Sequence, residues 1–469
     1  MSPTIEADIC VIGAGSAGLS VAAGTGQLGL RTVLIEAGEM GGDCLNTGCV
    51  PSKALLSATA ALRAHPGEGA EDFRGRINEH VRRAQQAIAP HDSQERFEGL
   101  GVTVLRSRAR FLDPETVQAG ETRVRARHFV VATGSRAAMP PIPGLDPARV
   151  LTNESIFDLA TVPEHLVIVG GGPIGIEMAQ AHRQMGSRVT VLEKGAILPK
   201  DDPELVAVVR ERLAAQGVVI REGVEIESVE HGTADHTVRV RDGNQPEAIS
   251  GSHILVAAGR KPNIEDLGLD AGGIAHARQG IKVDARLRTT NRRVFAVGDV
   301  AGGPQFTHVA SYHGAIAVQN IVFHIPAKVD YAALPWVTYT DPELAHVGMT
   351  LRDARARYGS RCEVITRSFS GLDRAQTSGG AAGIAKAIVT SRGRILGCSI
   401  VGPHAGELIG LWGLAISRRM TLRDITRLIL PYPSYGEIAK HVASDFYRPK
   451  LFSAWPRRIA SWLKVLPAA

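Results

Sequence analysis

Few aromatic residues and the lack of any long apolar run distinguish this sequence. Aromatic residues make up 5% of the 469 residues, whereas glycine occurs 51 times. This balance indicates a soluble α/β protein rich in tight turns rather than a secreted scaffold held by disulfides. No apolar run is long enough to cross a bilayer, and the apolar stretch 9–23 lacks the basic leading region of a signal peptide.

Cysteine is also scarce. The five cysteines are odd in number and spread over the chain, which argues against a structural disulfide framework. Their distribution favours a reducing compartment, so we expect a cytoplasmic protein. Three of them are interpreted as packing residues: Cys10, Cys362 and Cys398.

Acidic residues are missing from the last 24 positions, 446–469, which carry five basic residues. The formal net charge of the chain is +6, so the remainder is near +1. A nearly neutral body argues against nucleic-acid binding. The basic residues of this segment are Arg448, Lys450, Arg457, Arg458 and Lys464.

Two glycine-rich turns each follow a short apolar strand and open a helical run. The first spans 13–18 and the second 170–175. A second apolar strand in each unit ends in an acid, Glu36 or Glu193, and both the turns and the acids are 157 positions apart. Glycines let the backbone approach a pyrophosphate, the helix N-terminus meets its charge, and the acid accepts hydrogen bonds from a ribose. The sequence therefore predicts two dinucleotide sites.

The segment 41–53, Gly-Gly-Asp-Cys-Leu-Asn-Thr-Gly-Cys-Val-Pro-Ser-Lys, places two cysteines ahead of a helical run. Cys44 and Cys49 are separated by four residues, and Pro51 lies near the first turn of that run. A helix N-terminus lowers the pKa of a thiol and favours the reactive thiolate. The segment thus predicts a redox-active cysteine pair.

Together, this segment and the glycine turns resemble the class I flavoprotein disulfide reductases, which include dihydrolipoyl dehydrogenase, glutathione reductase and mercuric reductase. The resemblance covers nearly the whole chain. It implies an α/β fold with two Rossmann-like dinucleotide-binding domains, one for FAD and one for NAD(P), and a C-terminal α+β dimerisation domain. The implied parts are 1–148 and 276–334 for FAD, 149–275 for NAD(P), 335–446 for dimerisation and 447–469 for a basic amphipathic tail.

The resemblance also implies site residues. Cys44 would exchange with substrate, Cys49 would face the flavin, and Lys53 and Glu177 would pair beside the flavin ring. The alternatives are that Lys53 is a solvated helix residue and that Glu177 is an acid in the first turn of a helix, where the helix dipole favours it. The implied FAD-binding residues are Gly13, Gly15, Ser16, Ala17, Gly18, Glu36, Gly42, Lys53, Thr133, Gly134 and Asp299. The implied NAD(P)-binding residues are Gly170, Gly172, Ile174, Gly175, Glu193 and Gly259.

The regions between these motifs are less specific. Residues 61–94 are expected to be helical with a polar face, and 101–117 to form a β-meander of short alternating strands. After the second glycine unit, a buried strand ending at Asp299 is expected to return the chain to the flavin domain. Its aspartate corresponds to one that binds the ribityl chain in the family, and a turn cap is the alternative.

The implied reaction passes electrons from NAD(P)H through FAD to the cysteine pair and then to an acceptor, in a homodimer. We expect NAD(H) to be preferred over NADP(H), because Glu193 would repel a 2′-phosphate and no arginine lies in 194–198 to bind one. Lys194 is the feature that argues against this preference.

The family's C-terminal His-Pro-Thr-x-x-Glu motif is altered here to Tyr432 and Glu437 at the same spacing. A phenol titrates near pH ~10 and imidazole near ~6.5, so Tyr432 is a poor base at neutral pH, although it can donate a hydrogen bond. Mercuric reductases also have tyrosine in this region, but this chain lacks their C-terminal cysteine pair. The acceptor is therefore expected to be a small disulfide, with a thiophilic metal ion such as mercuric ion as the alternative. A redox-sensing flavoprotein of low turnover is a third hypothesis, of another class.

The tail places Ile459, Trp462, Leu463 and Leu466 on one face of a short helix expected to begin after Pro456. A basic amphipathic helix of this kind can lie on an anionic membrane surface. Packing of the same face on the protein's own dimer is the commoner alternative for so short a helix. Peripheral membrane contact is therefore one of two open interpretations.

Overall fold

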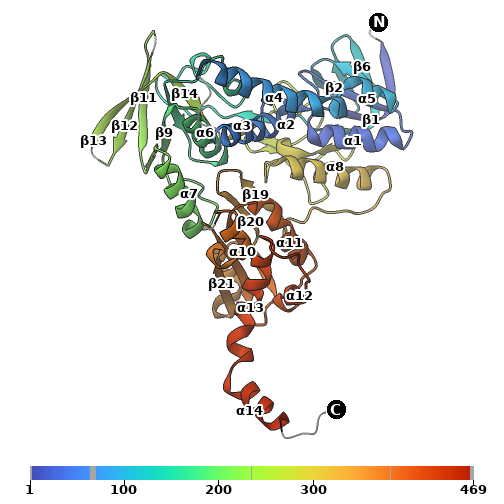
Figure 1. Ribbon diagram of the computed structural model, residues 1–469. Helices are drawn as coiled ribbons and strands as arrows, with labels where there is room; N and C mark the ends of the chain where they lie inside the picture. The colour runs from blue at the N-terminus through green and yellow to red at the C-terminus, as the bar shows by residue number, and fades with distance from the viewer. Residues whose placement is uncertain (1–2, 64–69, 234, 244, 381, 465–469) are drawn as a thin grey trace. The chain divides into compact units, whose positions relative to one another are not determined.

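The computed structural model describes residues 3–63, 70–233, 235–243, 245–380 and 382–464. The chain divides into two compact units (Figure 1). The first comprises Met1–Lys194 and Ile220–Val329, and the second comprises Gly195–Val219 and Asp330–Ala469. The first unit holds both glycine turns and both cysteines of the predicted pair.

The first sheet surrounds the first glycine turn and has the strand order β3-β2-β1-β6-β5-β4, with β18 also paired to β6. Its strands are β1 (Thr4–Ile12), β2 (Thr32–Glu36), β3 (Val102–Arg106), β4 (Ala109–Asp113), β5 (Thr116–Ala119), β6 (Thr122–Val131) and β18 (Val294–Ala296). Because β18 pairs in parallel with β6, the chain returns to its first sheet after the second glycine unit, as the sequence predicted.

The strands expected as a meander over 101–117 divide between the two edges of this sheet. β3 pairs in parallel with β2, whereas β4 and β5 pair antiparallel with each other and β5 with β6. The meander prediction was therefore wrong for β3. A parallel pairing needs a long crossover, and the helices between β2 and β3 provide it. These are α2 (Gly42–Asn46), α3 (Cys49–Arg63), α4 (Ala70–Asp92) and α5 (Gln94–Gly99).

The second sheet has the order β10-β9-β8-β14, in which β8 pairs in parallel with both β9 and β14. Its strands are β8 (His165–Val169), β9 (Arg188–Glu193), β10 (Val218–Glu222) and β14 (His253–Val256). A three-stranded sheet follows in sequence, with β11 (Glu225–His231), β12 (His236–Asp242) and β13 (Gln245–Gly251). Two short pairs complete the unit, β7 (Ser135–Ala137) with β15 (Arg260–Pro262) and β16 (His276–Ala277) with β17 (Gly280–Ile281).

The two glycine turns have the same geometry. Gly13 and Gly170 adopt φ angles of +105° and +114°, which L side chains rarely reach. A Cβ added to Gly13 would lie 2.4 Å from the carbonyl oxygen of Ala132, and one added to Gly170 would lie 2.4 Å from that of Ala257. Each turn therefore packs directly on the residue after a neighbouring parallel strand and leads into a helix, α1 (Ser16–Gln27) or α6 (Pro173–Gln184).

The second unit is built on a five-stranded antiparallel sheet in the order β19-β20-β23-β22-β21. Its strands are β19 (Pro335–Thr338), β20 (Glu343–Gly348), β21 (Cys362–Ser368), β22 (Ile384–Thr390) and β23 (Ile395–Gly402). Its helices are α7 (Pro203–Ala215), α9 (Leu351–Tyr358), α10 (Asp373–Thr377), α11 (Ala405–Ser417), α12 (Leu422–Thr426), α13 (Glu437–Leu451) and α14 (Ala454–Leu463). This is the α+β architecture expected for the C-terminal part.

The isolated cysteines behave as packing residues. Cys10 lies in β1 and Cys398 in β23, and both are fully buried, whereas Cys362 is half-buried. Burial raises the pKa of the Cys10 and Cys398 thiols. Over the described ranges, no helix combines the length and the apolar composition needed to cross a membrane.

Candidate active site

The two cysteines lie on consecutive helices, close to the N-terminus of the second helix. Cys44 is in α2 and is half-buried, whereas Cys49 is the first residue of α3 and is exposed. The Cys49 Sγ lies 3.4 Å from the hydroxyl of Thr307, the first residue of α8 (Thr307–Ile321). Two helix N-termini thus meet at Cys49, which favours negative charge there.

The two thiols differ in acidity. The hydrogen bond between them raises the pKa of Cys44 and is the largest cause that lowers the pKa of Cys49. The Thr307 hydroxyl and the charge of Lys53 also lower it, burial and the charge of Glu177 raise it, and the resulting pKa of Cys49 is about 6. At neutral pH the dithiol therefore holds Cys49 as the thiolate and Cys44 as the thiol.

Lys53 and Glu177 form an ion pair. The Lys53 Nζ, one turn after Cys49 on α3, lies 2.7 Å from the Glu177 Oε2 on α6. The Glu177 side chain is only 4% exposed, so the cation compensates a buried carboxylate. The pair also fixes a positive charge within reach of the Cys49 thiol.

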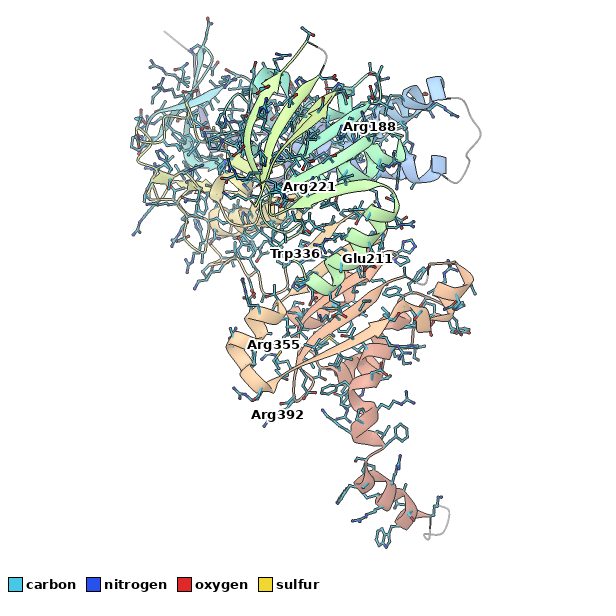
Figure 2. All side chains as sticks on the ribbon, turned by 90° about the vertical axis from the view of Figure 1, so that its left-hand side faces the viewer. Arg188, Glu211, Arg221, Trp336, Arg355 and Arg392 are labelled. Carbon is cyan, nitrogen blue, oxygen red and sulfur yellow. The ribbon has the colours of Figure 1, made fainter. Side chains whose placement is uncertain are left out.

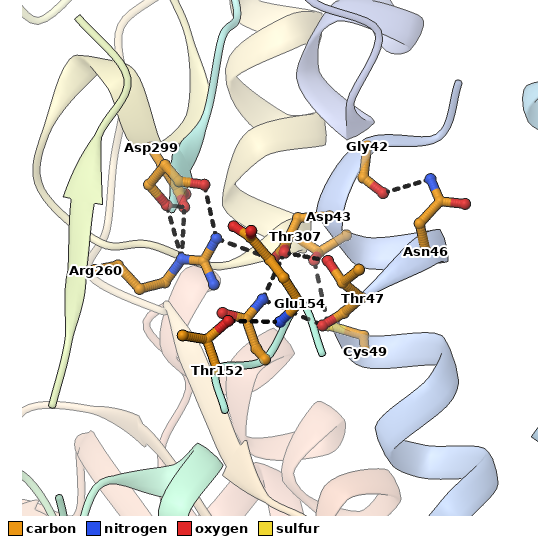
Figure 3. Close-up of polar contacts among 12 residues, drawn as sticks. Gly42, Asp43, Asn46, Thr47, Cys49, Thr152, Glu154, Arg260, Asp299 and Thr307 are labelled. Carbon is orange, nitrogen blue, oxygen red and sulfur yellow. Dashed lines mark hydrogen bonds and ion pairs between the residues drawn. The ribbon is translucent and has the colours of Figure 1, made fainter. Parts of the chain in front are cut away.

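A second cluster links the cysteine segment to the strand that returns to the first sheet (Figure 3). The guanidinium of Arg260 lies 3.0 Å from Asp43 and 3.8 Å from Asp299. Ser135 donates a hydrogen bond to Asp299 at 2.5 Å and accepts one from Arg260 at 2.7 Å. Burial raises the pKa of Asp299. The side-chain partners of Asp299 are thus Ser135 and Arg260, which argues against the turn-cap alternative.

The acids that follow the glycine turns both contact those turns. The Glu36 carboxylate accepts the backbone N–H groups of Ala14 at 2.5 Å and Gly38 at 2.6 Å. The Glu193 carboxylate accepts that of Gly171 at 2.6 Å. These carboxylates lie at the mouths of the turns, where a ribose hydroxyl could bind them.

The helix N-termini at these turns are suited to an anion. α1 and α6 have Gly15 and Gly172 as their N-caps, without a side-chain capping hydrogen bond. At the second turn, a Cβ on Gly172 or Gly259 would meet no atom within 4 Å, and at the first turn a Cβ on Gly15 would meet only the Cα of Gly42, at 4.0 Å. Space in front of the backbone N–H groups therefore fits a dinucleotide pyrophosphate at both turns. The described residues therefore fit both FAD and NAD(P).

The remaining flavin-site candidates are held close to the first turn. A Cβ on Gly42 would lie 2.7 Å from the Cα of Gly15, so the cysteine segment packs directly on that turn. The Thr133 hydroxyl donates to the carbonyl of Asn263 at 2.7 Å, and the Asn263 amide donates back to the Thr133 carbonyl at 2.9 Å. This exchange fixes the Ala-Thr-Gly turn that contains Gly134.

Tyr432 and Glu437 lie in the second unit and have separate partners. The Tyr432 side chain is 71% exposed, and its hydroxyl donates to Asp373 at 2.6 Å. The hydrogen bond to Asp373 raises the pKa of Tyr432, so even less of the phenol is deprotonated and available as a base at neutral pH than for an isolated tyrosine. Glu437 begins α13 and accepts the backbone N–H of Ser434 at 3.0 Å.

The comparisons with known proteins agree with this geometry. A family described as pyridine nucleotide-disulphide oxidoreductase matches residues 7–314, and its dimerisation domain matches residues 334–443. The chain belongs to this family. It is thus an oxidoreductase of an FAD-binding family that uses NAD(P)H, and it carries a dimerisation domain.

Curated members of the pyridine nucleotide-disulphide oxidoreductase family are similar along most of the chain. A mercuric reductase of Staphylococcus aureus is 31% identical over 451 residues, covering 94% of this chain and 82% of its own. A dihydrolipoyl dehydrogenase of Geobacillus stearothermophilus is 34% identical over 457 residues, covering 94% and 96%. Among solved structures, the Cu(II) complex of the HOCl-induced flavoprotein disulfide reductase RclA from Escherichia coli superposes with a TM-score of 0.83 at 27% identity, covering 94% and 99%.

Three site residues in this oxidoreductase were missed by sequence reasoning: Asp43, Arg260 and Thr307. Asp43 lies inside the cysteine segment, and Arg260 directly follows Gly259 of the second unit. Their adjacency to motifs was a usable signal, but their contact with each other depends on the fold. Within the part of the chain that the structure describes, no group of three or more His, Cys, Asp or Glu side chains is arranged to hold a metal ion.

Proposed function

We propose that the protein is an FAD-dependent NAD(P)H oxidoreductase in which the Cys44–Cys49 pair carries electrons to a thiol-reactive acceptor. The observation that carries this proposal is the unequal thiol pair at the start of α3, with the pKa of Cys49 lowered to about 6. An unequal pair is what directed exchange requires, because the thiolate and the thiol then have different roles. Cysteines that only pack in a core do not require two thiols of different acidity.

The chain's residues would hold the flavin through the first glycine turn. Glu36 and Asp299 would meet hydroxyl groups, and the N-terminus of α1 would meet the pyrophosphate. When bound, FAD accepts a hydride from NAD(P)H and passes two electrons on. Lys53 would stabilise negative charge on the reduced flavin, while Glu177 holds the Lys53 ammonium in place.

The cysteine pair would complete the transfer. Two electrons and two protons convert the disulfide to a dithiol, and release of one proton leaves Cys49 as the thiolate and Cys44 protonated. Cys44 would give up its proton, to the leaving thiolate of a disulfide or to water when a metal ion binds, and exchange with the acceptor while Cys49 stays beside the flavin. Transfer of the two electrons to the acceptor re-forms the disulfide, so the site is ready for another cycle.

NAD(H) is the nicotinamide that we propose. The Glu193 carboxylate at the mouth of the second turn would accept the ribose hydroxyls of NADH and repel the 2′-phosphate of NADPH. The working assembly that we propose is a homodimer, through the second unit.

Two acceptor classes suit a dithiol. A small disulfide was the first expectation, and reduction of one needs proton transfer to the leaving thiolate. Tyr432 is a poor proton donor for this transfer because Asp373 raises its pKa. A thiophilic metal ion needs two soft ligands and no protein base. The geometry of Tyr432 therefore favours a metal ion over a disulfide, and several relatives are mercuric reductases.

Turnover with a panel of acceptors tests the proposal. NADH oxidation would be followed with a lipoamide-type disulfide, a glutathione-type disulfide, mercuric ion and cupric ion. We expect the highest turnover with a metal ion and its loss in Cys44→Ser, whereas Cys362→Ser, at a half-buried cysteine outside the pair, keeps it. Faster turnover with a disulfide would restore the first expectation. Turnover that is low with every acceptor would favour the redox-sensing hypothesis.

A further inference from the structure

The C-terminal helix α14 (Ala454–Leu463) has no buried residue. It follows α13 and extends away from the rest of its own unit (Figure 1). It also lies beyond residue 443, where the match to the dimerisation domain ends. Within the described residues, α14 therefore does not contribute to the core of its unit.

The apolar side chains of α14 share one face. Trp455, Ile459, Trp462 and Leu463 occur at positions i, i+4, i+7 and i+8. Both tryptophans are 72% exposed. The helix begins at Ala454, earlier than expected, because a proline in the first turn removes an N–H that has no helical partner anyway. Leu466, predicted to extend this face, lies outside the described residues.

Two more exposed apolar residues precede the helix. Leu451 and Phe452, at the end of α13, are 61% and 57% exposed. They come shortly before α14 in the chain. We call residues 451–464 the tail segment. Its exposed apolar side chains are numerous enough to form a patch, and contiguous patches of this kind mark interaction sites.

The charge of this region has a single sign. At 100° per residue, Arg457 and Lys464 lie opposite the apolar face, and Arg458 lies at its border. Arg448 and Lys450 add positive charge at the end of α13, and no acid follows Asp445. A surface that is apolar on one side and basic on the other complements an anionic lipid headgroup layer above acyl chains.

We propose that the tail segment is a peripheral anchor that lies in the plane of an anionic membrane surface, a function beyond electron transfer to the acceptor. Tryptophan favours the boundary between headgroups and acyl chains, because its ring is apolar and its N–H is polar. The apolar face would enter that boundary while Arg457 and Lys464 contact lipid phosphates. At ten residues α14 is too short to cross a bilayer, which takes about 20.

Sedimentation of the full chain with vesicles tests the proposal. We expect binding to vesicles of phosphatidylcholine with phosphatidylglycerol, much weaker binding to phosphatidylcholine alone, and release by salt as the screening length falls from about 10 Å at 0.1 M to about 3 Å at 1 M. Arg457→Gln with Arg458→Gln should weaken binding by at least about tenfold. The matched control, Arg355→Gln with Arg392→Gln, removes two exposed charges of the same unit and should change nothing (Figure 2).

Tryptophan variants separate insertion from simple charge attraction. Trp455→Ser with Trp462→Ser should abolish binding, whereas Trp455→Phe with Trp462→Phe should keep it and lose the blue shift in fluorescence that vesicles cause in the parent. Equal sedimentation of the full chain and of a chain ending at Lys450 overturns the proposal. It is also overturned if both tryptophans are shielded from a soluble quencher before lipid is added and truncation dissociates the dimer, because the face would then be a contact between two copies.

Discussion

Lys53 Nζ and Glu177 Oε2 lie 2.7 Å apart and join helix α3 to helix α6. The contact ties the helix that begins with Cys49 to the helix that follows the second glycine turn. The carboxylate is almost fully buried, whereas the Lys53 side chain is 35% exposed. A buried carboxylate keeps its charge at low cost only beside a cation, so a change at Lys53 should affect both folding and the acidity of Cys49.

Lys53→Met removes that cation and retains most of the side-chain volume. We expect the free energy of unfolding to fall by about 1–2 kcal/mol, a modest loss because the lysine is partly exposed. The pKa of Cys49 should rise, since the Lys53 charge helps to lower it. Denaturant unfolding and thiol titration measure the two effects. Lys53→Arg should retain both properties, and unchanged values in Lys53→Met would contradict the role assigned to the pair.

The acidity of Cys49 gives a prediction for the reduced protein. Above pH about 6 the thiolate is present, and as the pH falls through that value it is protonated. The ultraviolet absorbance of the thiolate should follow this midpoint, and so should a long-wavelength thiolate-to-flavin band after anaerobic reduction by NADH. Cys49→Ser should abolish the band. Bleaching of the wild type without any such band would show that the pair is not redox-active.

Removal of the partner thiol should move that midpoint upward. Cys44→Ala deletes the hydrogen bond that lowers the pKa of Cys49 most, whereas Cys44→Ser keeps a hydrogen-bond donor and should shift the midpoint less. Cys362→Ser is the control, because Cys362 lies in β21 of the other unit. A midpoint that stays near 6 in Cys44→Ala would mean that Thr307, Lys53 and the helix N-termini set the acidity without the partner thiol.

Glu193→Gln tests the nicotinamide preference. The amide oxygen can still accept the N–H of Gly171, but the negative charge facing a 2′-phosphate is gone. We expect the ratio of kcat/KM for NADH over NADPH to fall by roughly tenfold, about 1.4 kcal/mol in transition-state binding. Glu36→Gln, the equivalent change at the first turn, should leave that ratio unaltered. A wild-type protein that prefers NADPH would overturn the assignment.

Arg260→Ala leaves Asp43 and Asp299 without the guanidinium between them. The two carboxylates would repel each other near the first glycine turn, so FAD should be retained less tightly. The measurement is flavin content after gel filtration, with free FAD added back afterwards. Arg221→Ala is a suitable control, because Arg221 also lies between two acids, Asp242 and Glu247, but none of the three is a flavin-site candidate. Equal flavin content in both variants would limit Arg260 to a packing role.

The sequence was most informative where chemistry is encoded locally. The glycine turns and their acids were recognisable because spacing along the chain fixes their geometry, and the two turns repeat the same contact, Glu36 with Ala14 and Glu193 with Gly171. Contacts between segments that are distant in the sequence could not be predicted in this way. The edge that β3 joins and the contact of Arg260 with Asp43 depend on how distant segments pack, which no local pattern specifies.

Tyr432 stands where the resemblance to glutathione reductase and dihydrolipoyl dehydrogenase implies a histidine. Tyr432→Phe removes the hydroxyl that donates to Asp373, and because the ring is largely exposed we expect less than about 0.5 kcal/mol of lost stability. If the hydroxyl serves the acceptor, the acceptor half-reaction should slow while flavin reduction by NADH stays intact. Equal loss of both half-reactions would make the residue structural.

Tyr432→His is the complementary gain test. Imidazole can exchange protons near neutral pH, so turnover with ordinary disulfides should rise if a missing base limits them, while turnover with metal ions should not. Asp373 would raise the pKa of the new histidine through its negative charge, so the gain should be largest with Asp373→Asn present as well. Asp373→Asn alone, with tyrosine retained, is the matched control. Stopped-flow measurement of each half-reaction decides the matter, and a disulfide turnover that stays low in both histidine variants would locate the limitation elsewhere than at position 432.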